Sequence, residues 1–138
     1  LTRNDRESAI SSFKSADSFY KKVESRGVVL AFSEAKRALY ENVKNAHVEE
    51  LYNVANEHLE SRNYSKALNL FEEITSLVPG YKDAEQLGDY SYCKPKYESG
   101  NEAMSEELFR TAYELYNDVV TRDSSFEDAE ERREEALV

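Results

Sequence analysis

The sequence contains no tryptophan, one cysteine, one methionine, two prolines and four glycines among its 138 residues. A single cysteine, Cys93, excludes an internal disulfide and leaves a cysteine-based metal site without a second ligand, so we interpret it as a small buried residue. So few prolines and glycines argue against a loop-rich fold. The longest apolar stretch, residues 28–32, is far shorter than the roughly 20 residues that a membrane-spanning helix needs. We therefore expect no transmembrane segment in this chain.

Hydrophobic residues make up 40% of the chain and charged residues 33%, which is enough apolar material for the core of one compact domain or a short solenoid. The net charge of -10 is unevenly spread: residues 1–46 carry nine Lys/Arg and six Asp/Glu, a net +3, and the remainder carries the acidic excess. An acidic surface repels phosphate backbones, and the larger part has no basic stripe interleaved with aromatics. We therefore expect no nucleic-acid partner.

Apolar residues recur at intervals of three and four almost throughout, and sustained alternation with a period of two is absent. This pattern predicts an all-α chain of about seven consecutive helices. Pro79-Gly80 and Gly100-Asn101 are expected to form turns, and Pro95 is expected to end or kink a helix. The predicted helices cover residues 5–25, 29–45, 48–61, 64–77, 82–95, 103–121 and 126–137.

The chain also repeats itself at a spacing of 45 residues. The triplet Asp83-Ala84-Glu85 recurs as Asp128-Ala129-Glu130. The preceding apolar positions follow the same shift: Tyr64, Ala67, Leu70, Phe71, Ile74 and Tyr81 match Phe109, Ala112, Leu115, Tyr116, Val119 and Phe126. A period of 20 to 50 residues is typical of stacked-repeat proteins, in which each unit buries its apolar face only against its neighbours.

Residues 48–81 resemble one unit of the tetratricopeptide family, of the bacterial type. They contain Leu51-x2-Val54-Ala55-x2-His58, then Ala67-x3-Phe71, then Pro79, at the spacings of the family pattern W-x2-L-G-x2-Y, A-x3-F, P. His58 departs from the Tyr of that pattern, and Ile74 stands where a small residue is usual. The second unit is 45 rather than 34 residues long, so we expect an insertion of 11 residues between Lys94 and Phe109.

The resemblance implies antiparallel helix hairpins stacked as a short right-handed α-solenoid; a closed helical bundle without a groove is the rival architecture. It divides the chain into four parts. These are an N-terminal hairpin (1–46), a well-matched repeat (47–81), a diverged repeat with the insertion (82–125), and an acidic C-terminal helix (126–138) that is either a cap or the start of a further repeat.

In tetratricopeptide hairpins the first helix of each unit lines a concave groove that binds a peptide or protein segment. By this resemblance the groove residues are Glu49, Tyr52, Asn56, Glu60, Tyr90, Lys94 and Tyr97. Tyrosine suits recognition because it buries a large area at a modest entropic cost. The expected function is therefore a protein-binding scaffold. The alternative is a structural spacer or oligomerisation module of a larger cell-envelope protein, with a possible homodimer and a bacterial envelope or periplasmic location.

Residues that would carry chemistry are sparse. His47 and His58, 11 residues apart on a helix, would lie about 16 Å apart along its axis and could not share a metal ion. Carboxylates occur as adjacent pairs such as Glu72-Glu73, whose side chains point about 100° apart on a helix and do not converge. The chain has no phosphate loop, zinc-protease or nucleophile-elbow motif. We expect no enzyme activity, catalytic residues, metal, cofactor or small-molecule substrate.

Overall fold

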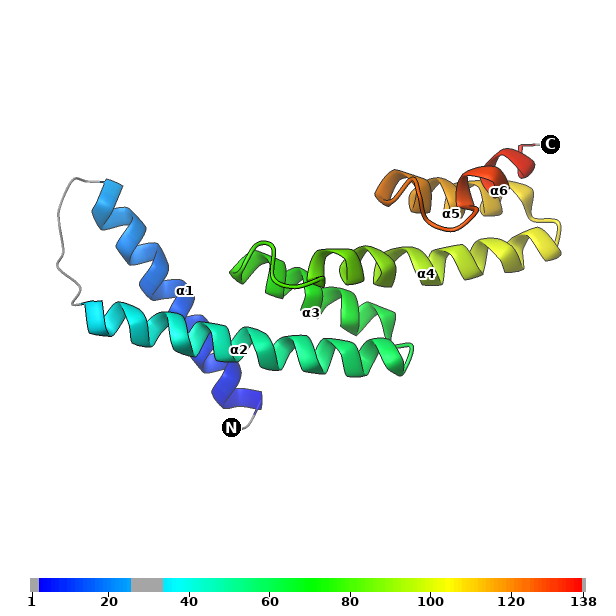
Figure 1. Cartoon of the computed structure of the whole chain (residues 1–138). Coiled ribbons are helices and arrows are strands. Elements are labelled where there is room, and N and C mark those ends of the chain that lie inside the picture. Colours follow the sequence, from blue (N-terminus) through cyan, green and yellow to red (C-terminus); the bar gives the residue numbers. More distant parts are fainter. Residues whose placement is uncertain (1–2, 26–33, 138) are drawn as a thin grey trace. The chain divides into compact units, whose positions relative to one another are not determined.

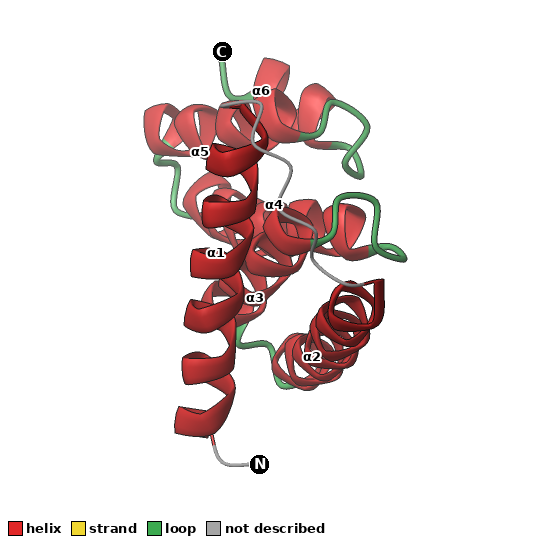
Figure 2. Cartoon of the chain, turned by 90° about the vertical axis from the view of Figure 1, so that its left-hand side faces the viewer, coloured by secondary structure: helices red, strands yellow, loops and turns green. Residues whose placement is uncertain are grey.

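The computed structural model describes residues 3–25 and 34–137 (Figure 1). Every regular element in these ranges is an α-helix, and Figure 2 shows helices and loops there but no strand. This confirms the predicted all-α class, with six helices in the described residues. They are α1 (Arg3–Ser25), α2 (Glu34–Glu60), α3 (Tyr64–Leu77), α4 (Ala84–Ser105), α5 (Phe109–Arg122) and α6 (Ala129–Glu135).

Helix α2 is longer than the sequence predicts. A helix over residues 29–45 and another over 48–61 were expected, but α2 continues from Glu34 to Glu60. The predicted break is wrong because Asn45-Ala46-His47-Val48 contains neither glycine nor proline, and no side chain there forces the helix to end. The predicted residues 29–33 and the stop at Gly27 lie outside the described residues.

Helix α4 corrects three further expectations. It runs through Pro95 without ending, and Gly100 and Asn101 lie inside it rather than in a turn. The helix therefore ends at Ser105, and α5 begins at Phe109 instead of residue 103. A proline removes one helical hydrogen bond but leaves the helix intact where neighbouring helices hold it on both sides.

The chain divides into two compact units, residues 1–50 and 51–138. In the first unit α1 packs against the beginning of α2. The rings of Phe13 and Tyr40 meet edge to face with centroids 5.0 Å apart, and the Tyr40 hydroxyl donates a hydrogen bond to the Phe13 carbonyl at 3.2 Å. Arg6 also forms an ion pair with Glu50. These contacts join α1 to α2 within the first unit.

The second unit holds the end of α2 together with α3 to α6. The ring of Tyr52 on α2 meets the buried Phe71 of α3, with centroids 6.3 Å apart, which confirms that these helices pack together as expected. Helix α4 contacts both α3 and α5, and α5 contacts α6. The core of this unit is built from small and aromatic residues: Ala55, Ala67, Phe71, Ile74, Ala84, Cys93, Tyr97, Ala103, Ala112, Tyr116, Val119, Phe126, Ala129 and Ala136.

The 45-residue sequence repeat has a structural counterpart within this unit. Arg62 and Glu107, which are 45 residues apart, both have φ 61° in the turns that follow α2 and α4. Lys82 and Glu127, also 45 residues apart, have φ 42° and 44°. Non-glycine residues rarely adopt this left-handed region. Matching conformations at matching positions therefore show that both turns are built in the same way.

Backbone hydrogen bonds repeat with the same spacing. Asn63 N–H donates to the His58 carbonyl at 2.8 Å, and Leu108 N–H donates to the Ala103 carbonyl at 2.8 Å. The register also continues through α4, where Tyr97 and Gly100 correspond to Tyr52 and Ala55. The residues by which the second repeat exceeds the 34-residue family length therefore lie in its first helix, the 22-residue α4, and not in an inserted loop.

Candidate partner-binding surface

Two tyrosines of the predicted groove occupy equivalent places in the two repeats. The Tyr52 hydroxyl donates a hydrogen bond to Asp83 Oδ1 at 2.5 Å. The Tyr97 hydroxyl donates one to Asp128 Oδ1. Each bond ties a first helix to the turn that precedes the next first helix. The geometry therefore gives both hydroxyl groups a role within the fold, which the sequence alone did not indicate.

Three groove residues on α4 converge on the turn before α6. The ring of Tyr90 lies 6.0 Å from that of Phe126, Lys94 Nζ lies 3.5 Å from the Glu127 carboxylate, and Tyr97 reaches Asp128. Tyr97 is only 7% exposed, whereas Tyr90 is 38% exposed. Tyr97 thus contributes little surface to a partner, and Tyr90 and Lys94 are the accessible members on this helix.

The remaining predicted residues lie on α2. Asn56 is half-buried, and its side-chain amide donates to the Tyr52 carbonyl at 2.9 Å. Glu60 is exposed. Glu49, in the first unit, is also exposed. Among the described residues none of these carboxylates forms an ion pair, so both are available to a partner.

The pKa values of the residues around the second Tyr–Asp hydrogen bond are shifted from their ordinary values. The hydrogen bond from Tyr97 lowers the pKa of Asp128, and Arg132 lowers it further. Arg132 Nε lies 2.9 Å from Asp128 Oδ2, and the bond to Asp128 raises the pKa of Arg132. Burial and the same aspartate raise the pKa of Tyr97. The tyrosine stays protonated, the aspartate ionised and the arginine charged, so each keeps the state that this bond needs.

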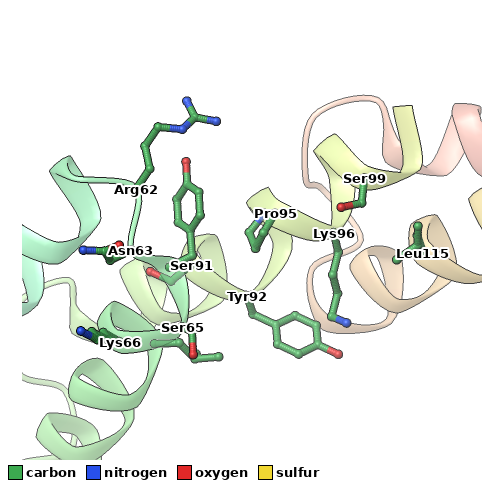
Figure 3. Close-up of a pocket in the computed structure, with 12 residues that line it drawn as sticks. Arg62, Asn63, Ser65, Lys66, Ser91, Tyr92, Pro95, Lys96, Ser99 and Leu115 are labelled. Atoms are coloured by element: carbon green, nitrogen blue, oxygen red, sulfur yellow. The ribbon is translucent and has the colours of Figure 1, made fainter. Parts of the chain in front are cut away.

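The structure also has a groove of about 850 Å³, which the sequence analysis did not predict (Figure 3). Its lining residues lie between Arg62 and Leu115 in the sequence. Tyr92 and Lys96 extend from α4 into the space between α3 and α5 (Figure 3). The lining residues are Arg62, Asn63, Tyr64, Ser65, Lys66, Leu68, Ser91, Tyr92, Pro95, Lys96, Ser99 and Leu115. A proline within a helical pattern was the available signal, but it was interpreted only as the end or a kink of a helix and not as part of a surface.

Beside this groove Arg122 joins three helices. Its Nε donates to Asp89 Oδ1 at 2.7 Å on α4, and its Nη2 lies 3.7 Å from Glu72 Oε1 on α3. The guanidinium also covers the ring of Tyr92 at 4.8 Å from its centroid, and Lys96 Nζ lies 5.1 Å from the same centroid. Tyr92 is therefore held by two cations, which fixes its place in the groove wall.

Cys93 is fully buried, as predicted, and its Sγ lies 3.8 Å from the Val119 carbonyl oxygen. Burial raises the pKa of its thiol to about 11. A thiol with so high a pKa is a poor nucleophile near neutral pH, because the thiolate is the reactive form. Cys93 therefore acts as a packing residue.

Within residues 3–25 and 34–137 no three His, Cys, Asp or Glu side chains come together in a way that would hold a metal ion. No helix of the described residues is both long enough and apolar enough to cross a membrane.

Comparisons with protein-family models, with curated proteins and with solved structures find no match for this chain.

Proposed function

We propose that this chain is a non-catalytic scaffold of the tetratricopeptide kind, in which helix hairpins stack as a right-handed solenoid and a concave surface binds a peptide or protein segment. One observation carries this proposal: the two repeats share their turn conformations and their Tyr–Asp hydrogen bond at a spacing of 45 residues. Repeats that join to their neighbours through the same contacts are typical of solenoids, and solenoids commonly bind partners along an extended face.

The accessible residues of the predicted groove have the chemistry of a binding surface. Glu60 is exposed, Asn56 and Lys94 are half-buried, and Tyr90 leaves more than a third of its side chain open to solvent. Partly buried aromatic residues beside polar groups are enriched at the centres of interfaces. Tyr52 and Tyr97 would support this surface by holding the helices in place.

A structural or oligomerisation role is the second candidate, and it too is favoured by an observation. Leu108 is 51% exposed, Phe109 41% and Leu137 60%. In the first repeat Tyr64, which corresponds to Phe109, lies against Tyr90 with ring centroids 6.4 Å apart. The second repeat leaves Phe109 without such cover among the described residues, and a second copy could supply it.

Affinity capture with paired charge reversals tests the two candidates. Glu49→Lys with Glu60→Lys changes the predicted side of α2, because residues 11 apart on a helix have nearly the same azimuth. Glu106→Lys with Glu130→Lys makes the same change in net charge at two other exposed positions. We expect the α2 variant alone to lose most of a partner captured by the unchanged chain. Equal capture by both variants contradicts the groove.

The oligomerisation alternative needs a separate measurement. Sedimentation of the chain at increasing concentration, with and without Phe109→Ser and Leu137→Ser, reports self-association. Self-association that these two changes abolish, together with unaltered capture by the α2 variant, favours the structural role. A monomer that captures no protein contradicts both candidates.

A further inference from the structure

The groove shown in Figure 3 is cationic on an acidic chain. Arg62, Lys66 and Lys96 line it, and none of its 12 lining residues is Asp or Glu. Residues 47–138 carry the acidic excess of the chain, so a wall with only basic charges contrasts with the overall charge of the part in which it lies. A concave surface lined by one sign of charge favours a ligand of the opposite sign.

The three cations differ in how far the chain already neutralises them. Arg62 donates two hydrogen bonds of 2.7 Å to Glu98, so its charge is satisfied. Lys96 Nζ lies 3.6 Å from Asp118, and this surface pair is weak. For Lys66, the described residues offer no carboxylate within ion-pair distance. Lys66 and Lys96 therefore remain available to an anionic ligand.

Pro95 supplies an independent observation, because it lies in the wall of the same groove. A proline inside a helix removes one backbone hydrogen bond and destabilises the helix. α4 nevertheless continues for ten residues beyond it, to Ser105. Residues that break a local rule in this way are expected at functional positions. Here the half-buried ring presents a rigid apolar surface between Tyr92 and Ser99.

Apolar groups complete the lining. The ring of Tyr92, held by Lys96 and Arg122, lies in the same wall as Leu68 and Leu115. A purely electrostatic site for phosphate or nucleic acid would not need these side chains. Asp118 pairs with Lys96, and Asp89 and Glu72 pair with Arg122 beside the groove. These carboxylates confine the cationic surface to the groove lining, which favours a short acidic segment over a long polyanion.

We propose that this groove binds an acidic peptide segment of a partner protein, a segment that also carries aliphatic side chains. Its carboxylates pair with Lys66 and Lys96, and its aliphatic side chains lie on Tyr92, Pro95 and Leu115. This site is separate from the α2 and α4 residues of the proposed function, so either can fail without the other.

Fluorescence anisotropy with a labelled peptide of alternating Glu and Leu tests the site, with an alternating Gln and Leu peptide as the uncharged comparison. We expect the Glu peptide to bind and the Gln peptide to bind at least about tenfold more weakly, a difference of about 1.4 kcal/mol. Raising the salt concentration from about 0.05 to 0.5 M should weaken only the Glu peptide. Equal binding of the two peptides, or none, overturns the proposal.

Two variants separate the groove from general electrostatics. Lys66→Glu with Lys96→Glu should weaken the Glu peptide at least about tenfold, whereas Lys14→Glu with Lys36→Glu, an equal change in net charge at exposed positions of the first unit, should change it less than about twofold. Equal weakening by both pairs overturns the proposal. Tighter binding of a single-stranded DNA oligonucleotide than of the Glu peptide also overturns it, in favour of a phosphate ligand.

Pro95→Ala separates a loss of binding from a loss of folding, because it restores a helical hydrogen bond and should stabilise the fold. We expect this variant to melt at a higher temperature and to bind the Glu peptide several-fold more weakly. Opposite changes in stability and affinity are not explained by unfolding. A more stable variant that binds with unchanged affinity overturns the role of Pro95 in the groove.

Discussion

The two repeats of the second unit share a backbone plan and differ in how their side chains complete it. Tyr52 and its bond to Asp83 lie at the surface, with Lys82 Nζ 4.7 Å from the tyrosine ring centroid. Tyr97 is buried, and its acceptor Asp128 is also held by Arg132. The first bond is exposed, whereas the second is part-buried and is donated by a buried tyrosine. Equal positions in a repeat therefore do not imply equal contributions to stability.

The same contrast appears where the helices of each hairpin meet. Ala55 and Phe71 occupy the positions that Gly100 and Tyr116 occupy 45 residues later. Tyr116 is fully buried, and its hydroxyl donates to Asn101 Oδ1 at 2.7 Å. The smaller residue on α4 makes room for the larger ring on α5. Gly100 is therefore a packing residue.

The largest expected effect comes from filling that space. In Gly100→Ala the new Cβ would lie 2.6 Å from Tyr116 Cε1 and 3.0 Å from two further ring atoms. We expect a loss of about 1–3 kcal/mol in the free energy of unfolding, measured by urea denaturation. Helix propensity alone predicts a gain of about 1 kcal/mol, so a stabilised variant would show that the ring does not constrain this position.

The next effect concerns the paired hydroxyl groups. Hydrogen bonds to charged groups contribute about 1.5–3 kcal/mol, so Tyr97→Phe should cost about 2 kcal/mol. Tyr52→Phe should cost less than about 1 kcal/mol, because water can replace the bond at the surface. Urea denaturation of both variants measures the difference. Equal losses in the free energy of unfolding would mean that the greater burial of Tyr97 does not strengthen its hydrogen bond relative to that of Tyr52.

The depressed pKa of Asp128 makes the second repeat sensitive to acid. A carboxyl whose pKa is lower in the folded state stabilises the fold above its unfolded value of about 3.9, and this contribution disappears as the pH falls through the lower folded value. The melting temperature of the unchanged chain should therefore exceed that of Asp128→Asn, and this margin should stay constant between about pH 6 and 8. The margin should shrink below about pH 4.

Tyr97→Phe serves as the control for that experiment, because it removes the main cause of the shift. When Asp128→Asn is compared with the unchanged aspartate in this Tyr97→Phe background, the pH-dependent part of the margin should be smaller, and its loss should be complete at a higher pH, because the folded pKa of Asp128 lies closer to its unfolded value. A margin that stays constant down to about pH 2 would contradict the pKa shift.

The smallest expected effect is a gain. Gly88 also lies inside α4, but a Cβ added there would lie 3.4 Å from Phe71 Cβ, which is close to ordinary contact. We expect Gly88→Ala to raise the free energy of unfolding by about 0.5–1 kcal/mol, because alanine loses less backbone entropy than glycine. A loss as large as that of Gly100→Ala would show that α3 and α5 approach α4 equally closely.

Much of the fold was predictable because it depends on local pattern. Apolar spacing predicted the all-α class, and the matching triplets Asp83-Ala84-Glu85 and Asp128-Ala129-Glu130 located the repeated turn. The extent of α4 was not predictable. The sequence signals at Pro95 and Gly100 are those of a helix end, and only the contacts with α3 and α5 outweigh them.

The candidate site was less predictable than the fold. The resemblance placed Tyr52 and Tyr97 on the first helix of each repeat, but it could not show that their hydroxyl groups bind aspartates 31 residues away. Whether a tyrosine faces solvent or a neighbouring turn depends on tertiary packing. The groove beside Pro95 depends on three helices, and no single stretch of sequence describes it.

Helix α4 belongs to both hairpins at once, and this affects how the second unit loses its structure. Its residue Gly88 lies against α3, and its residue Gly100 lies against α5, so neither hairpin can separate without exposing part of the same 22-residue helix. Stacked repeats otherwise open one at a time from their ends. We therefore expect α3, α4 and α5, which share this helix, to unfold together as a single cooperative foldon.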